Sequence, residues 1–218
     1  MKRGTISAHS RLAFHVSRFT TLAFALGAGA LSLVRPAGAQ ETGTPVFHAP
    51  YRSFSQYDFG ASASFQRESQ TGLEAYYRRA FGRLDLGLRA GGMIRDSVGD
   101  SFLIGVEGRH PVISEQTFPL RGALVAGIGL DISGGASVWV PVGLALGRRL
   151  NVEASSVSFV PYVQPTGIFT SVGSTKLAFA LGLGMDMRLS PAFELRVSGS
   201  FGTDAAPAGV AATAAWLR

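Results

Sequence analysis

Histidine is the first place to look for chemistry, because its side chain exchanges protons near neutral pH. The chain has 4 histidines, of which His48 and His110 lie beyond residue 39. A hydrolytic site would need a Ser or carboxylate partner beside one of them, and no His-x-Ser-Asn pattern occurs. His110 falls at a predicted turn. We therefore expect no catalytic residues and no enzyme activity.

Two further patterns could hold a metal ion or a phosphate. Asp96 and Asp100 share one short connection whose oxygens could bind Ca²⁺, although carboxylates next to Gly99 are more often turn formers. The Gly-x-Gly segments at 127–129 and 182–184 have no following helix or Lys, so they are not phosphate-binding loops. The sequence thus predicts no metal site and no cofactor.

The charges divide the chain into two parts. Lys and Arg number 20 against 14 Asp and Glu, but 5 of the cations and none of the acids lie in residues 1–39, so the remaining 15 cations leave a net charge of +1. Residues 19–34 form an apolar run, and residues 37–39 are small, as signal peptidase requires. We predict a signal peptide over 1–39, cleaved before Gln40. An uncleaved membrane anchor is the alternative, for which the run is short.

The remaining residues belong to an exported protein that must fold without disulfides, since the chain has no Cys. Their near-neutral charge lacks the basic surface that binding of nucleic acid needs. A mean hydropathy of +0.24 is too polar for a helical bundle in lipid. Residues 40–56 contain Pro45 and Pro50 and little periodicity, which predicts an extended periplasmic N-terminal segment.

From residue 57 onward, apolar and polar residues alternate with a period of two, as in strands with one apolar face. In residues 177–189, Leu, Phe and Met occupy every odd position. We predict about ten strands in 57–218, or eight, because Pro161 and Pro165 weaken the run 151–164. The runs are 57–67, 72–81, 83–94, 101–109, 119–132, 137–147, 151–164, 176–188, 192–201 and 208–217.

The polar face of these runs carries Arg and carboxylates among many Gly and Ala, while residues 40–218 hold one Lys, Lys176. Arg suits multiply hydrogen-bonded ion pairs in a confined space. We therefore predict a closed antiparallel transmembrane β-barrel with an apolar exterior, rather than a soluble sandwich. The charges predicted to bridge its lumen are Glu74, Arg78, Asp85, Arg89, Glu107, Arg109, Arg121, Asp131, Asp186, Arg188, Glu194 and Arg196.

Aromatic residues near the ends of the apolar rows are typical of the girdles at membrane interfaces. The predicted girdle residues are Phe81, Phe102, Phe193, Phe201 and Trp216. Connections after even-numbered runs are mostly tight and those after odd-numbered runs looser, which predicts periplasmic turns and exterior loops respectively. The longest predicted exterior loop, 165–175, presents Ile168 and Phe169 for contact with a partner.

A signal peptide, about ten alternating strands, tight turns such as 189–191 and a final strand bearing Trp216 resemble the small outer-membrane β-barrel proteins of Gram-negative bacteria. In that family the last residue is usually Phe or Trp, whereas Arg218 follows Leu217 here. The resemblance implies a monomer in the cell outer membrane, with outer-membrane lipid and the assembly machinery as partners.

Three functions remain open from the sequence. A lumen crossed by ion pairs favours a closed barrel with a structural or surface-exposed role. A narrow pore or small hydrophobic-ligand channel is an alternative, because ten strands enclose more width than the eight that side chains just fill. The third is a surface adhesion or binding module acting through 165–175.

Overall fold

The computed structural model describes residues 42–66, 69–95, 99–132, 136–153, 155–171, 176–203 and 208–218. The predicted signal peptide 1–39 and Asp96 of the candidate Ca²⁺ pair lie outside the described residues. No helix within these ranges is long and apolar enough to cross a membrane.

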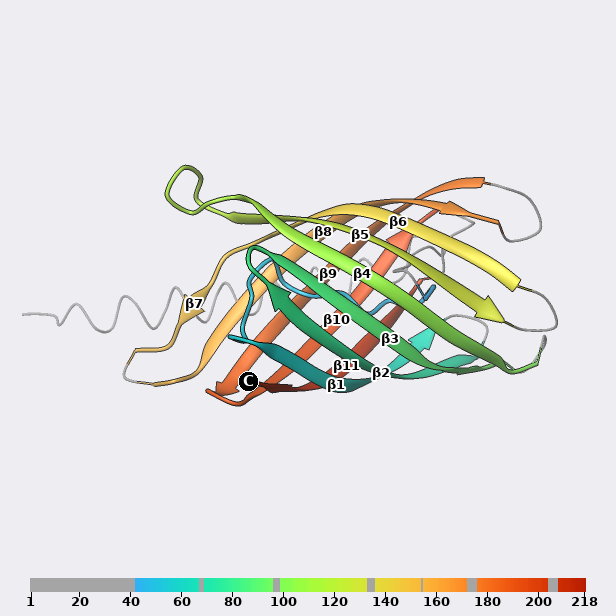
Figure 1. The fold of residues 1–218 in the computed structure, drawn as a ribbon, viewed down its shortest axis with the longest axis horizontal. Coiled ribbons are helices and arrows are strands. Elements are labelled where there is room, and N and C mark those ends of the chain that lie inside the picture. Colours follow the sequence, from blue (N-terminus) through green and yellow to red (C-terminus); the bar gives the residue numbers. More distant parts are fainter. Residues whose placement is uncertain are drawn as a thin grey trace, which may run out of the picture. The chain divides into compact units, whose positions relative to one another are not determined.

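The described residues form one antiparallel sheet that closes on itself (Figure 1). Its strands are β1 (Tyr57–Gln66), β2 (Gln70–Phe81), β3 (Leu84–Ile94), β4 (Ser101–Ile113), β5 (Arg121–Ile132), β6 (Ala136–Gly147), β7 (Leu150–Asn151), β8 (Ser158–Thr170), β9 (Lys176–Ser190), β10 (Phe193–Gly202) and β11 (Gly209–Leu217). Each long strand pairs with its neighbours along the chain, β6 pairs with β8, and β1 pairs with β11. The two-residue β7 pairs with β8 beside this ring. The predicted closed barrel of ten long strands is thereby confirmed over the described ranges.

The barrel wall has an apolar outside and a polar inside. On β9, Phe179 and Leu183 point outward and are 58% and 40% exposed, whereas the intervening Ala180 and Gly182 are buried. The same alternation runs through β1, β2, β4, β8 and β10. A soluble sandwich would have buried the apolar rows against each other, so the arrangement is the inverse of a sandwich.

The predicted girdle residues lie on the outer wall. Phe81, Phe102 and Trp216 are exposed, and Phe193 and Phe201 belong to the outward row of β10 and are half-buried. Trp216 stacks on Phe59 of the neighbouring strand, with 5.8 Å between ring centroids. Phe193 meets the same indole edge-on at 5.5 Å.

Strand β8 corrects two predictions. The run 151–164 is displaced to 158–170, and 165–170 is therefore strand rather than exterior loop. Pro161 and Pro165 are tolerated because both point outward and the pairing of β6 with β8 is interrupted next to Pro165. Ile168 is fully buried inside the barrel, and only Phe169 points outward. The pair thus cannot act as a loop contact.

The terminus-bearing mouth is the end of the barrel where β1 begins and β11 ends. Strand bounds place the connections 82–83, 114–120, 148–157 and 191–192 there. The opposite mouth is the end where β1, β3, β5, β8 and β10 end. The prediction of tight turns at the terminus-bearing mouth holds for 82–83 and 191–192. The prediction of a tight turn after residue 147 is wrong, because β8 begins only at Ser158. The serines between β7 and β8 do not join the strand pairing.

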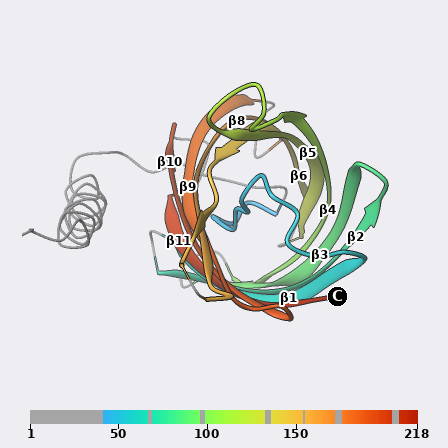
Figure 2. The same ribbon diagram turned by 90° about the vertical axis from the view of Figure 1, so that its left-hand side faces the viewer.

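Residues 42–54, which we call the lumen segment, lie inside the barrel. Residues 42–51 are all buried, and the view along the barrel shows this segment surrounded by strands (Figure 2). The sequence had predicted a periplasmic extension. The structure differs because the barrel interior supplies hydrogen-bond partners for this segment, which has none of its own secondary structure.

Candidate functional site

The lumen holds an ion-pair cluster around Asp58, at the start of β1. Arg78 of β2 donates from Nε to Asp58 Oδ1 at 2.9 Å and from Nη2 to Oδ2 at 2.7 Å. Arg196 of β10 donates from Nη2 to the same Oδ2 at 2.7 Å. All three side chains are at least 96% buried. These ion pairs therefore tie β1 to β2 and to β10 on the inner face of the wall, to either side of the β1–β11 closure.

Arg196 is the residue that joins the most carboxylates in the described lumen. Besides Asp58, its Nε lies 2.6 Å from Glu194 Oε1 and 3.8 Å from Asp186 Oδ2. Its Nη1 donates to the Tyr76 hydroxyl at 2.8 Å. Arg and Glu two positions apart on one strand point to the same side of the wall, which explains the contact with Glu194.

Two further arginines bind the lumen segment rather than bridging strands alone. Arg109 of β4 pairs with Glu107 at 2.7 Å and donates to the His48 and Ala49 carbonyls at 3.1 and 2.8 Å. Arg89 of β3 lies 3.8 Å from Glu74 and donates to the Val46 carbonyl at 3.4 Å. These contacts satisfy backbone oxygens that no sheet partner reaches.

Other lumen residues complete the seat of the segment. Asp186 accepts from the Ala49 amide at 2.9 Å, and Glu74 accepts from the Thr44 hydroxyl at 2.7 Å. Ser198 accepts from the Phe47 amide and donates to the Pro45 carbonyl. The ring of Phe47 lies over Gly182, where an added Cβ would come within 2.7 Å of it. Glycine at that position therefore makes room for the segment.

His48 lies among the arginines of the lumen. Its Nδ1 and Nε2 are each 3.3 Å from a guanidinium nitrogen, of Arg196 and Arg89 respectively. A neutral imidazole has one acceptor nitrogen, so it can accept from one of the two. Burial lowers the pKa of His48 well below its ordinary value, and Arg196, Arg78, Arg109 and Arg89 lower it further. The imidazole is held in its neutral form.

The predicted lumen charges fall into three groups in the structure. Arg78, Arg89, Arg109, Arg196, Glu74, Glu107, Asp186 and Glu194 are buried along the lumen. Asp85 and Asp131 are buried nearer the mouths, where Asp85 pairs with Arg52 at 2.5 Å and Asp131 pairs with Arg95. Arg188 and Arg121 lie outside these pairs: Arg188 donates to the Ser190 and Pro191 carbonyls of a turn, and Arg121 stacks on Tyr51.

The sequence missed Asp58, Tyr76 and the whole lumen segment. Asp58 could have been found, because it shares the alternating polar face of β1 with Gly60, Ser62 and Ser64. The sequence placed His48 in the N-terminal segment and gave it no role. Its contacts are arginines and the Tyr76 ring, and within the described residues no group of His, Asp and Glu could hold a metal ion.

Comparisons with known proteins give distant matches of fold. No protein-family model matches the chain, and no curated protein matches it in sequence. A bacterial polysaccharide outer membrane secretin matches with a TM-score of 0.44 and 9% sequence identity. The match covers 75% of this chain and 65% of the secretin chain. The β domain of the Bordetella autotransporter Brka matches with a TM-score of 0.46 and 16% sequence identity. The match covers 73% of this chain and 96% of that domain. The N-terminal β-barrel domain of Pseudomonas aeruginosa OprF matches with a TM-score of 0.34 and 12% sequence identity. The match covers 74% of this chain and 96% of that domain.

These scores and identities are low, and the likeness says nothing about function. The chain spans just under two thirds of the secretin that it matches. The barrel itself is established by the strand pairing, in which β1 and β11 close the sheet.

Proposed function

We propose that this chain is an integral outer-membrane β-barrel protein with a closed lumen and a structural or surface-exposed role. The observation that carries the proposal is the inverted wall, apolar outside and charged inside. Exposed Leu, Phe, Val and Ile recur on strand after strand, and burying that surface in hydrocarbon is worth roughly 25 cal/mol per Å². A sheet with no free edge lets its strands satisfy their backbone groups in lipid by pairing with one another. Outer-membrane lipid and the barrel-assembly machinery are the partners that we propose for a monomer.

The closed lumen is supported by buried side chains and by a chain segment inside the barrel. The ion pairs of Asp58 with Arg78 and Arg196 bridge the wall, and the lumen segment fills the space beside them. A barrel of this size has little interior left for water. Passage of ions along the axis would therefore require these groups to move.

Membrane insertion is tested by the migration of detergent-extracted protein on SDS gels, with and without boiling. A closed sheet resists SDS, so the unboiled protein should migrate faster than the boiled protein. Recovery in the soluble periplasmic fraction, with migration that boiling leaves unchanged, would contradict the proposal.

Closure of the lumen is tested separately by conductance in planar bilayers. The chain without residues 1–39 should insert and give no stable conductance steps. Large and stable steps would overturn the closed barrel and favour a porin-like role.

A gated narrow pore is the second candidate, favoured by the way in which the lumen segment is held. Its contacts with the wall include hydrogen bonds to Asp186, Arg109 and Ser198, and residues 42–56 contain no strand. If the segment is a gate, the intact chain should give brief, small conductance steps, which deletion of 42–54 should make continuous. A permanently closed lumen predicts that the intact chain stays silent.

A further inference from the structure

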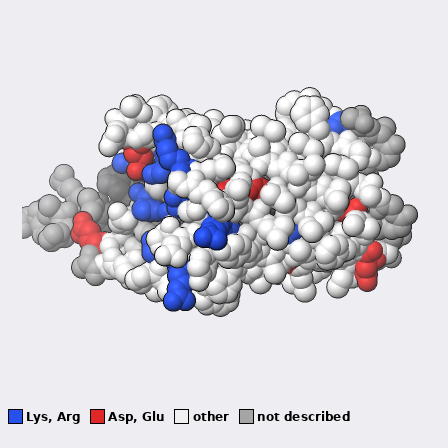
Figure 3. All heavy atoms as spheres, in the orientation of Figure 1, with Lys and Arg blue, Asp and Glu red and all other residues white. Residues whose placement is uncertain are grey.

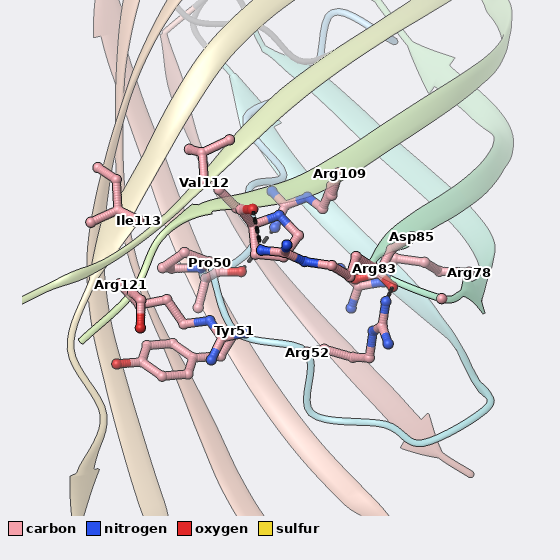
Figure 4. A pocket seen from close by; sticks show the side chains of 15 residues that line it. Pro50, Tyr51, Arg52, Arg78, Arg83, Asp85, Arg109, Val112, Ile113 and Arg121 are labelled. Carbon is pink, nitrogen blue, oxygen red and sulfur yellow. Dashed lines mark hydrogen bonds and ion pairs between the residues drawn. The ribbon is translucent and has the colours of Figure 1, made fainter. Parts of the chain in front are cut away.

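A cavity of about 350 Å³ opens at the terminus-bearing mouth, between the lumen segment and strands β2 to β5 (Figure 4). This volume lies within the range of small-molecule sites, roughly 300–1,000 Å³. The described residues that line it include five arginines and one carboxylate, which are Arg52, Arg78, Arg83, Arg109, Arg121 and Asp85. A cavity with this lining has a strong excess of positive charge.

Three of the five guanidinium groups are already neutralised by carboxylates. Arg78 pairs with Asp58, Arg109 with Glu107 and Arg52 with Asp85. These arginines hold the barrel and the lumen segment together, so their presence in the lining has a structural explanation.

Arg83 and Arg121 have no such explanation. Neither has a carboxylate at ion-pair distance among the described residues. Arg83, in the β2–β3 turn, is exposed, and the one acceptor it reaches in the described part of the chain is the Pro111 carbonyl, at 3.5 Å. Arg121 at the start of β5 stacks on the Tyr51 ring at 5.3 Å, and its buried Nε has no hydrogen-bond partner among the described residues. Two uncompensated cations therefore face one cavity.

The rest of the lining adds apolar surface. Ala49, Pro50 and Ala123 contribute it, beside Tyr51 and Ser114. An inorganic anion would fill only part of this space. The lining thus suits a molecule with an anionic group at one end and carbon atoms at the other.

We propose that this cavity binds a small phosphate monoester, with its phosphate between Arg83 and Arg121 and its organic part against Pro50 and Ala123. A phosphate monoester carries a charge of about −1.5 to −2 at neutral pH, which matches two free cations better than one carboxylate does. The guanidinium fork donates two parallel hydrogen bonds to phosphate oxygens. Basic side chains gathered at this end of the molecule (Figure 3) would attract such an anion from solution.

The same phosphate could come from a free metabolite or from a lipid headgroup. Titration calorimetry on the full chain, purified from membranes in a non-ionic detergent, separates the two sources. Glycerol 3-phosphate is the free probe, and dihexanoyl phosphatidic acid presents the same phosphomonoester on a lipid. Tighter binding of the first points to a soluble ligand, and tighter binding of the second to a lipid. Both outcomes support a phosphate site.

Variants connect the binding to the two arginines. R83Q and R121Q should each raise the Kd of the better probe about tenfold, because each removes a charge-assisted contact, and the double variant should not bind measurably. R79Q is the matched control, since Arg79 lies near the same mouth but on the outer wall, over Phe81. It should leave the Kd unchanged.

The folding of each variant is measured separately from its binding. The cavity is defined by its lining residues and does not depend on the membrane assignment. Each variant should retain the heat-modifiable migration of the parent chain, and R83Q is the safest because Arg83 is exposed. Absence of saturable binding of either probe to folded parent protein overturns the site. So does an equal loss of affinity in R79Q and R83Q, which would show only a general effect of charge.

Discussion

The two faces of one strand meet opposite environments in this barrel. On β10, Arg196 is 1% exposed and touches three carboxylates, a hydroxyl and an imidazole. The next residue, Val197, is 47% exposed on the outer wall. Adjacent residues therefore have different requirements. Arg196 needs specific hydrogen-bonding partners, whereas Val197 needs only to be apolar.

This difference is one of specificity rather than of hydrophobicity. A lipid-facing Val or Leu can be replaced by any residue that hydrocarbon tolerates. A lumen-facing charge cannot, because its partners come from other strands and stay buried when it is removed. The lumen should therefore show larger effects of conservative truncation, and the outer wall larger effects of added charge.

The largest effect is expected at Asp58. D58A leaves Arg78 without its carboxylate partner and removes one of the three carboxylates around Arg196, and breaking a buried pair in this way costs about 3–5 kcal/mol. The free energy of unfolding, measured by urea titration of protein folded into lipid vesicles, should fall accordingly.

D85A provides the comparison for Asp58. Asp85 also pairs with an arginine, but its partner Arg52 is partly exposed at the mouth, and such pairs contribute about 1 kcal/mol or less. Equal losses in D58A and D85A would contradict a specific, buried lumen network.

The outer wall is tested by Leu183, near the middle of β9. L183R places a cation against hydrocarbon and should lower the free energy of unfolding by about 2–4 kcal/mol. L183I keeps the surface apolar and should have a much smaller effect. If Arg and Ile are tolerated equally, Leu183 does not face lipid and the membrane assignment fails.

A smaller effect is expected where the wall meets the lumen segment. In G182A the new Cβ would lie 2.7 Å from the Phe47 ring, and overpacking of this kind costs about 1–3 kcal/mol. The cost should disappear when the same change is made in an F47A background, because the clash is then absent. A cost that persists in F47A would mean that Phe47 does not occupy this place in solution.

The wall of the barrel could be predicted from the sequence because its signal is local. Alternation along 177–189 needs no knowledge of other strands, and β9 extends over Lys176–Ser190. The period-two alternation also predicted which charges point inward. Proline and serine obscured β8, so Ile168 was placed in a loop although Ser158–Thr170 alternates without interruption.

The lumen segment could not be predicted because its contacts are not local. Ala49 binds Asp186 from 137 residues away, and Pro45 binds Ser198 from 153 residues away. The segment has no periodicity, since it packs on a curved interior rather than on one face. Asp58 differs, because the alternation of β1 already placed it inward.

The smallest expected effect concerns His48 and pH. In the unfolded chain this imidazole takes up a proton below about pH 6.5, whereas in the barrel burial and the four arginines around it lower its pKa and keep it neutral. The unfolded state then binds more protons than the folded state, so the free energy of unfolding falls as the pH drops below about 6.5 and is unaffected above it.

The variant H48Q isolates this contribution. Glutamine keeps a donor and an acceptor but does not titrate. The temperature at which the variant converts from the folded to the unfolded gel band should therefore fall less than that of the parent chain when the pH is lowered from about 7.5 to 5. The carboxylates and the exposed His110 are present in both proteins. Their contributions therefore cancel when the pH profile of H48Q is subtracted from that of the parent chain. Identical pH profiles for the two proteins would mean that the imidazole is open to water, and hence that the lumen segment does not remain inside the barrel.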